Sequence, residues 1–250
     1  MSSPDAPPVV RHAAWTRCTH WVAALSIAVL AVTGFVILMA HPRLYWGEVG
    51  NSLTPALLEL PISRNHRHGG WTGTTPIFDR TGSPVSANRT YAIFNQNSWG
   101  RSLHFLSAWL LLVTGGLYVL AGVLSGHLRR HVMPRGDDLV PRTLADDARR
   151  HLRFAVPPAG GGPTYGPLQK IAYTMVVSLL LPLAVLTGVT MSPTVTASAP
   201  WLLSVFGGVQ SARTIHFGVW VALVLFVIAH VVMVVATGFR RHMRAMTIGD

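Results

Sequence analysis

The sequence is poor in cysteine and in charged residues. Cys18 is the single cysteine, which excludes a disulfide framework, a cysteine-rich zinc site, a four-thiolate iron–sulfur cluster and covalent haem attachment through Cys-x-x-Cys-His. Charged residues make up 12% of the chain and hydrophobic residues 50%, whereas a soluble domain carries about 25% charged residues. This balance excludes an ordinary soluble enzyme and a disordered or fibrous protein, and it favours an integral membrane protein.

Four apolar runs are long enough to cross a bilayer as helices, which requires about 20 residues each. They predict an all-α integral membrane fold, a four-transmembrane-helix bundle in a single membrane domain over residues 1–250. The first run is longer than the apolar part of a cleavable signal peptide, which is about 7–15 residues. The runs are Val22–Ala40, Leu103–Gly126, Ile171–Met191 and Ile215–Gly238, and the helices are expected at about 16–40, 101–126, 168–191 and 212–239.

Arginine and lysine are distributed unevenly between the two sides of these predicted spans. If the N-terminus lies inside, the inner segments 1–20, 127–170 and 240–250 hold 13 of the 20 basic residues, and the outer segments 41–101 and 193–213 hold 7. Basic residues concentrate in cytoplasmic loops, so both termini are predicted to be cytoplasmic. The net charge of +11 is then explained by loops that face an anionic lipid leaflet, and no nucleic-acid partner is needed.

Some loop segments have predicted roles of their own. The outer loop 41–100 is long and contains tryptophans such as Trp71 in its middle, which favours a docking surface over simple membrane anchoring. The inner loop 127–167 contains a predicted surface helix over Val140–Phe154, with acidic residues early and arginines late. The second outer loop contains Trp201–Phe206, which is predicted to be a short interfacial segment.

An internal repeat relates the second run to the fourth. Each opens with an Arg-x-x-His-Phe stretch, and each closes on a glycine 22 residues after that histidine. The matched spacing predicts a two-plus-two architecture with related halves, a type of fold that often places its sites between the repeats. The matching stretches are Arg101–Phe105 and Arg213–Phe217, then Gly126 and Gly238, and more weakly Thr33–Gly34 and Thr187–Gly188.

Four histidines lie within the spans or just inside their ends, where ionisable residues are costly and usually functional. His216 and His230 are 14 residues apart, which places them on one helix face and about 21 Å apart along its axis. His104 opens a span on the outer side and is therefore level with His216. His20 opens a span on the inner side and is level with His230. The sequence thus predicts two pairs, His104–His216 and His20–His230.

Two bis-histidine pairs suit two haem irons in the core of a helical bundle. Such a haem has no open coordination position, which favours electron transfer over oxygen or substrate chemistry. A zinc site would need three or four clustered ligands, and no Asp or Glu occurs inside any run, which also disfavours a carboxylate-based pump. For a single histidine, a hydrogen-bonded structural role is the alternative. Glycines that would let a flat macrocycle approach, or simply let helices pack, are Gly34, Gly115, Gly116 and Gly188.

Basic residues near the histidines are candidates for binding haem propionates. Arg101 and Arg213 each lie one helical turn before an outer histidine, where a guanidinium can pair with a carboxylate. Arg17 and Lys170 are the corresponding inner candidates, together with Arg240 and Arg241. Membrane anchoring of the inner residues is the alternative interpretation.

Several stretches between about Thr16 and Gly249 resemble the bacterial di-haem cytochrome b family. They are Thr19–Trp21, His41–Gly47, Leu103–Phe105, Ser125–His127, Leu168–Tyr173, Thr187–Gly188 and Gln210–His216. The family includes bacterial cytochrome b561 and the membrane subunits of nickel–iron hydrogenase and formate dehydrogenase. The chain is most similar to the thiosulfate-reductase-type branch, because the His41–Gly47 stretch and the long outer loop depart from the hydrogenase and formate dehydrogenase pattern. The family's haem ligands map onto His20, His104, His216 and His230.

This resemblance implies a function in transmembrane electron transfer in the bacterial cytoplasmic membrane. It implies two haem b groups as cofactors, a quinone that reacts at the inner end near His20, Gln169 and Lys170, and a periplasmic oxidoreductase partner of the molybdopterin type. The protein would bind and tune the cofactors, with no catalytic residue of its own. Two alternatives stay open: a haem-free membrane anchor subunit with structural histidines, and a histidine-based metal transporter.

Overall fold

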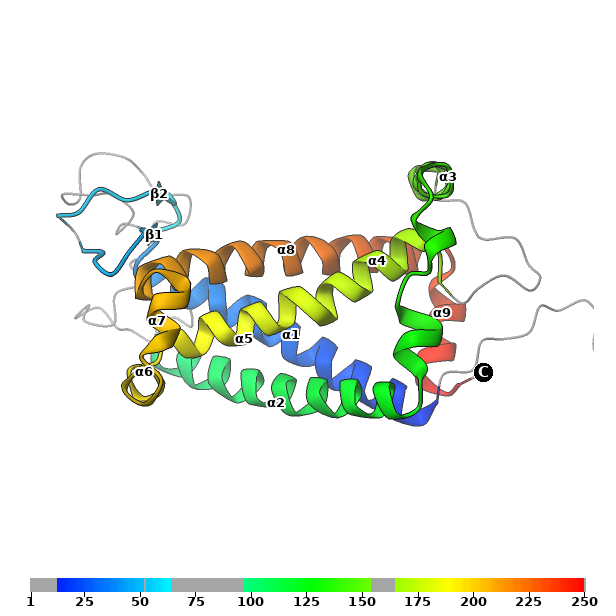
Figure 1. Ribbon diagram of the computed structural model, residues 1–250, viewed down its shortest axis with the longest axis horizontal. Helices are drawn as coiled ribbons and strands as arrows, with labels where there is room; N and C mark the ends of the chain where they lie inside the picture. Colours follow the sequence, from blue (N-terminus) through cyan, green and yellow to red (C-terminus); the bar gives the residue numbers. More distant parts are fainter. Residues whose placement is uncertain (1–12, 52, 64–96, 154–164, 250) are drawn as a thin grey trace, which may run out of the picture. The chain divides into compact units, whose positions relative to one another are not determined.

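The computed structural model describes residues 13–51, 53–63, 97–153 and 165–249, and the described chain is mostly helical (Figure 1). Within these residues, four stretches of helix are long and apolar enough to cross a membrane. The predicted all-α membrane fold with four spans is therefore confirmed. The first, second and fourth spans are α1 (Ala14–Ala40), α2 (Asn97–Leu124) and α8 (Val209–Ala236); the third joins α4 (Pro167–Met175), the π-helical turn η5 (Val176–Leu180) and α5 (Leu181–Thr190).

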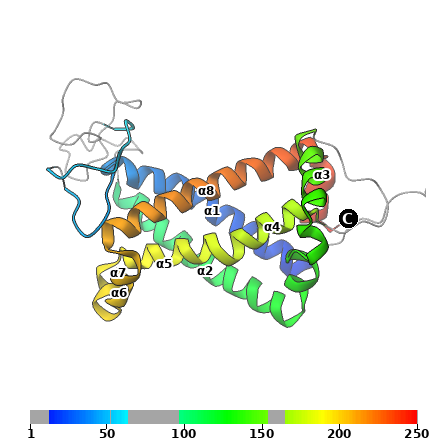
Figure 2. The ribbon, with the colours of Figure 1, turned by 45° about the horizontal axis from the view of Figure 1, so that its top comes forward.

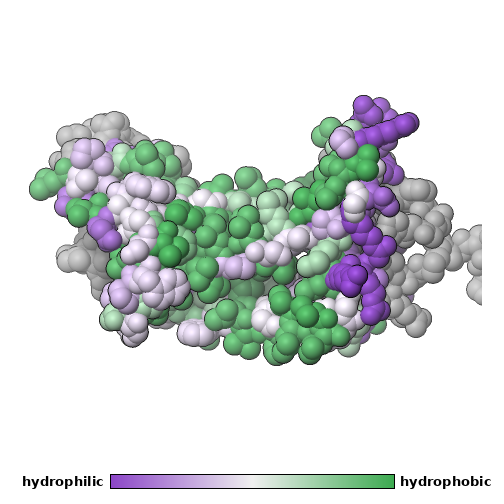
Figure 3. Space-filling view, viewed as in Figure 1, coloured by the Kyte–Doolittle hydropathy of each residue, from purple (hydrophilic) through white to green (hydrophobic). Residues whose placement is uncertain are grey.

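The span surfaces are apolar on the outside as well as inside. Trp109 on α2 is 65% exposed and Leu225 on α8 is 61% exposed, which would be unfavourable in water. Hydrophobic side chains cover α5 and α8 in the space-filling view, whereas hydrophilic ones gather on the short helix α3 (Pro141–Leu152) (Figure 3). In a helix every backbone group between the ends is paired internally, so these surfaces can face lipid.

Two compact units can be distinguished in the chain, and each span contributes to both. Unit 1 contains the first part of α1, the second part of α2, α4 with η5, and the second part of α8. Unit 2 contains the remainder of these spans. In residue ranges, unit 1 comprises Met1–Ala23, Val113–Leu180 and Leu223–Asp250, and unit 2 comprises Ala24–Leu112 and Leu181–Ala222.

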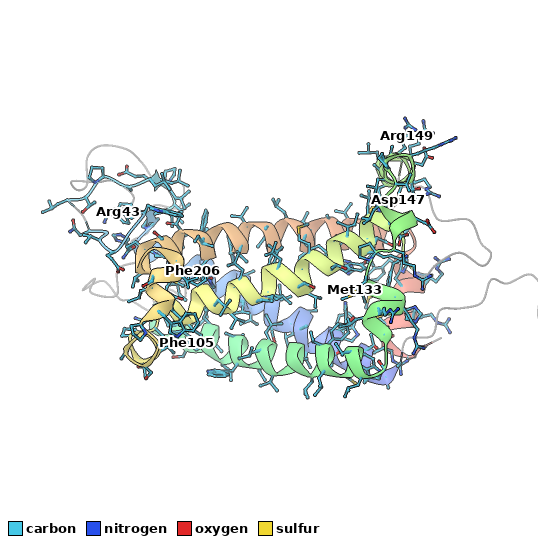
Figure 4. All side chains as sticks on the ribbon, viewed as in Figure 1. Arg43, Phe105, Met133, Asp147, Arg149 and Phe206 are labelled. Carbon is cyan, nitrogen blue, oxygen red and sulfur yellow. The ribbon has the colours of Figure 1, made fainter. Side chains whose placement is uncertain are left out.

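Unit 1 contains the predicted surface helix of the inner loop, observed as α3. Pro141 occupies its first turn and basic residues its last turn, where they complement the helix dipole. The buried Asp147 carboxylate accepts the backbone N–H of Leu168 at 3.0 Å and so caps the start of α4. Figure 4 shows Asp147 on the side of α3 that faces α4, with Arg149 directed away. The shorter elements of unit 1 are η3 (Leu128–Val132), η4 (Gly136–Leu139) and α9 (Phe239–Thr247).

The two glycines of the sequence repeat mark equivalent helix ends. Gly126 follows α2 with φ of 70°, and Gly238 follows α8 with φ of 120°. Positive φ is readily adopted only by glycine, so these residues stop the spans and turn the chain. The basic stretch that follows each glycine then forms η3 in one half of the repeat and α9 in the other.

Unit 2 contains a small two-stranded sheet that is linked to the start of α8. Strands β1 (Arg43–Leu44) and β2 (Leu58–Glu59) pair antiparallel. The predicted interfacial segment is the helix α7 (Trp201–Phe206), which ends at Gly207 in the left-handed conformation. It follows α6 (Pro193–Ser198), and both short helices pack beside the end of α5 (Figures 1 and 2).

Candidate haem-binding sites

Unit 2 brings His104 of α2 and His216 of α8 together. Their ring centroids are 6.3 Å apart, and the ring planes are inclined at 61°. Both rings are partly buried between the helices. His104 and His216, which the sequence repeat and the predicted membrane depth had paired, therefore lie together within unit 2.

A threonine orients each of these rings. The Nδ1 atom of His104 lies 3.0 Å from Thr33 Oγ1, and that of His216 lies 2.9 Å from Thr187 Oγ1. Each hydroxyl donates its single proton to the carbonyl one turn earlier in its own helix, at 2.7 Å for Thr33 and 2.6 Å for Thr187. The hydroxyl oxygen must therefore accept from the histidine Nδ1–H. This fixes the tautomer in which Nε2 has no proton and can bind a metal.

The glycine after each threonine brings the backbone close to the same ring. A Cβ atom on Gly34 would lie 3.5 Å from His104 Cε1, and one on Gly188 would lie 3.5 Å from His216 Cε1. The Thr-Gly echo between the first and third spans is therefore a matched support for the two histidines. Beside Gly115 and Gly116 of α2, by contrast, an added Cβ would meet nothing within 4 Å.

Unit 1 brings His20 of α1 and His230 of α8 together in aromatic surroundings. Their ring centroids are also 6.3 Å apart, with planes inclined at 54°. Phe226, one turn before His230, stacks on its ring at 6.0 Å, and Tyr173 of α4 meets the ring edge-on at 6.4 Å. Trp21 lies against His20 at 5.3 Å.

The spacing of both pairs fits one metal ion between two imidazoles. A metal–imidazole nitrogen bond is about 2.0 Å long and the ring centre lies about 1.1 Å further on, so opposite ligands have centroids about 6 Å apart. Both observed distances agree with this value. In the part of the chain that the structure describes, no group of three or more His, Cys, Asp or Glu residues is arranged to hold a metal ion.

The basic candidates differ in what they contact. Arg213 donates a hydrogen bond to the backbone carbonyl of His41. Arg101 is exposed on α2. Lys170 forms an ion pair with Asp138 at 2.9 Å, and the two side chains are only 7% and 13% exposed. The guanidinium of Arg17 lies against Gly249.

Electrostatic effects are pronounced at two groups outside the spans. The pKa of Asp138 is lowered, mainly by the hydrogen bond that its carboxylate accepts from the backbone N–H of Arg135 and further by Lys170. Burial, together with the charges of Arg213 and Arg43, lowers the pKa of His41 to about 4. His41 is therefore neutral at physiological pH.

The threonine partners of the histidines and the acidic partner of Lys170 were not expected from the sequence. Thr33-Gly34 and Thr187-Gly188 were visible as an echo, and their position in otherwise apolar runs was the available signal. Gln169, expected near a quinone, accepts the backbone N–H of Gly166 at 3.0 Å through its side-chain oxygen. Trp71 and most of the predicted docking loop lie outside the described residues.

A known protein family and a described relative each match most of the chain. The family model of prokaryotic cytochrome b561 matches residues 11–249. A protein of Azospira oryzae described as a subunit of a protein-methionine-sulfoxide reductase, YedZ1, is 27% identical over 223 residues, which cover 89% of each chain. No solved structure matches the chain.

Proposed function

Because the chain belongs to the prokaryotic cytochrome b561 family, we propose that it holds two b haems, one between His104 and His216 and one between His20 and His230. The family makes it a multi-pass bacterial membrane protein that binds haem b and takes part in membrane electron transfer. The observation that carries the two-haem assignment is the equal 6.3 Å spacing of both histidine pairs.

The two proposed sites share helix α8, which supplies one histidine to each. Haem b, when bound, takes up and releases one electron at its iron. The chain's residues hold the ligands in place: Thr33 and Thr187 present the Nε2 atoms of one pair, and Phe226 and Tyr173 pack around His230 of the other. Two histidines on each iron would leave no position for a substrate, which suits electron transfer.

We propose that the partner is a periplasmic oxidoreductase of the molybdopterin type. The relative described as a reductase subunit supports a role as the membrane subunit of such a complex. With both termini in the cytoplasm, the His104–His216 pair is on the periplasmic side of the inner membrane, and loop 41–100 is the proposed docking segment of that side. A quinone then reacts at the cytoplasmic end, near His20, Gln169 and Lys170.

The ligand assignment is tested by haem content. The purified protein should show a reducible b-type spectrum with two haems per chain. His216→Ala should remove one haem and His230→Ala the other, with distinct spectral losses, because each changes one pair only. His151→Ala changes a histidine of α3 whose ring bonds to the Asp147 carbonyl at 2.9 Å; it should keep both haems and serves as the control.

The alternatives predict other outcomes. A haem-free anchor subunit would show no b-type spectrum after purification from cells that supply haem. A histidine-based metal transporter would bind a metal ion without haem, with stoichiometry that falls in the same histidine variants. Either result, or retention of both haems in both variants, would exclude the proposed ligand set.

A further inference from the structure

The segment His41–Gly47 is attached to the start of α8 through its backbone. Its carbonyl oxygens accept hydrogen bonds from the first two turns of the helix that carries His216. These bonds use backbone carbonyls of the segment and not the side chains of His41 and Arg43. The bonds run to the His41 carbonyl from Arg213, to the Tyr45 carbonyl from Thr214 at 2.6 Å, and to the Gly47 carbonyl from the N–H groups of Gln210 and Ser211 at 3.0 and 3.2 Å.

The side chains of this segment gather beside Arg213. The His41 ring stacks on Tyr45 with centroids 5.6 Å apart, and an Arg43 guanidinium nitrogen lies 3.2 Å from His41 Nδ1. Arg43 is only 4% exposed although it carries a full charge; Figure 4 labels it on β1. We call His41, Arg43 and Arg213 the arginine–histidine cluster.

The described charges of this cluster do not balance. Arg43 and Arg213 contribute two positive charges, and each lies close enough to affect the electrostatics of His41. Glu59, the cross-strand neighbour of Arg43, affects the electrostatics of the adjacent Tyr45 hydroxyl. Arg213 donates to a neutral backbone carbonyl, whereas a guanidinium in a largely buried place is stable only with a counter-charge.

His41 adds a hydrogen-bond donor that has no acceptor in the described structure. Arginine can only donate, so His41 Nδ1 must accept from Arg43, and the ring proton of the neutral imidazole is on Nε2. This Nε2 atom is buried and has no hydrogen-bond partner among the described residues. A buried donor without an acceptor is destabilising, which favours an acceptor group at this position.

We propose that the arginine–histidine cluster binds a carboxylate, namely a propionate of the haem held by His104 and His216. The cluster presents donors only, and a carboxylate is an acceptor with two oxygens and the missing negative charge. Arg213 lies three residues before His216 on α8, so the two side chains occupy neighbouring positions on the helix surface. This proposal rests on the haem assignment above and names two residues, His41 and Arg43, that lie outside the spans.

The test observes the carboxylate itself. The full-length protein is loaded with haem carrying ¹³C at its propionate carboxyl carbons, and redox-difference infrared spectra are recorded. Arg43→Gln and His41→Phe should each shift the isotope-sensitive carboxylate band of one haem. His41→Phe keeps a ring against Tyr45 and removes both nitrogens. Arg149→Gln on α3, at an exposed arginine, is the control and should leave the band unchanged.

The outcomes separate this proposal from the haem assignment. If the protein held no haem between His104 and His216, the proposed function itself would fail before any infrared comparison. If the haem were present and neither variant shifted a labelled band, the carboxylate assignment would be wrong. If only unlabelled bands shifted, the cluster would bind a carboxylate from another source, such as a soluble acid or a side chain, and the propionate assignment would also be overturned.

Haem affinity gives a second measurement that does not depend on spectra of the carboxylate. A hydrogen bond to a charged group contributes enough that its loss should weaken haem retention at this site by roughly 10–100-fold in Arg43→Gln. Haem at the His20–His230 site should be retained as in the parent, which reports that the chain is folded. If Arg43→Gln did not fold, His41→Phe would decide the question by the same two readouts.

Discussion

Replacing Thr187 or Thr33 by valine should change the haem between His104 and His216 and leave the other haem unchanged. Valine keeps the branched shape of threonine and removes the oxygen that accepts the histidine Nδ1–H at 2.9 Å (Thr187) or 3.0 Å (Thr33). That hydrogen bond makes the imidazole a more electron-rich ligand and so stabilises the oxidised iron. Its loss should therefore raise the reduction potential of this haem.

The size of the shift follows from the energy of one hydrogen bond. A typical bond contributes about 1 kcal/mol, and we assign about half of that to the difference between the oxidised and reduced states. For a one-electron couple, a tenfold change in the equilibrium corresponds to about 59 mV. Each variant should thus raise the potential by about 20 mV, and the double variant by about 40 mV. Loss of an orienting partner should also weaken haem affinity by roughly 10–100-fold.

The assay is a potentiometric titration of the purified protein, followed at the haem absorption bands. Thr190→Val is the matched control, because Thr190 is fully buried on the same helix and its hydroxyl donates only to the Leu186 carbonyl at 2.7 Å. It should leave both potentials unchanged. Unchanged potentials and haem retention in Thr187→Val and Thr33→Val would refute the idea that the threonines tune the ligands. A shift in the potential of the haem at His20 and His230 instead would show that the threonines do not act on the His104–His216 site.

Three further predictions concern the stability of the protein, its membrane topology and its docking to a partner. Asp138→Asn should lower the free energy of unfolding by about 1–3 kcal/mol at pH 7, because it leaves Lys170 nearly buried without its partner. The pKa of Asp138 is lowered from 3.8, so the difference in stability between parent and variant should persist above pH 3.8 and vanish as the pH falls through the lowered pKa. Thermal unfolding at several pH values checks this, and an equal difference in strong acid would contradict it. A reporter enzyme fused after Asp250 should be active in the cytoplasm and one fused after Ser198 in the periplasm, and the reverse pattern would invert the proposed topology. Shortening the chain between Ser63 and Ala87 should leave both haems bound but slow electron exchange with the purified partner enzyme, whereas an unchanged rate would exclude a docking role for this loop.

The spans and the histidine pairs were predictable because hydrocarbon imposes simple rules. A run such as Val22–Ala40 has few alternatives to a membrane helix, and an ionisable residue inside it requires a specific partner. The helical period then placed His216 and His230 on one face of α8. Depth alone was enough to match His104 with one of them and His20 with the other.

The supporting contacts were not predictable to the same degree. A threonine in an apolar helix commonly bonds to the carbonyl one turn earlier, so nothing in the sequence distinguished Thr187, which also accepts from a histidine, from Thr190, which does not. The spacing of Arg213 predicted a propionate partner, and the structure adds a contact with the His41 carbonyl that the spacing did not indicate. Such contacts depend on which loop packs against which helix, and a local sequence pattern does not indicate this.

The attachment of His41–Gly47 to α8 has a consequence for biosynthesis. Its hydrogen bonds join residues 163 to 172 positions apart in the sequence, so this segment leaves the ribosome long before its partner helix exists. More than one hundred residues separate His104 from His216, which corresponds to roughly 5–20 s of synthesis at typical rates. Both histidine pairs stay incomplete until α8 is inserted into the membrane. Haem loading at the two proposed sites therefore follows the synthesis of α8, and a chain truncated before α8 can complete neither pair.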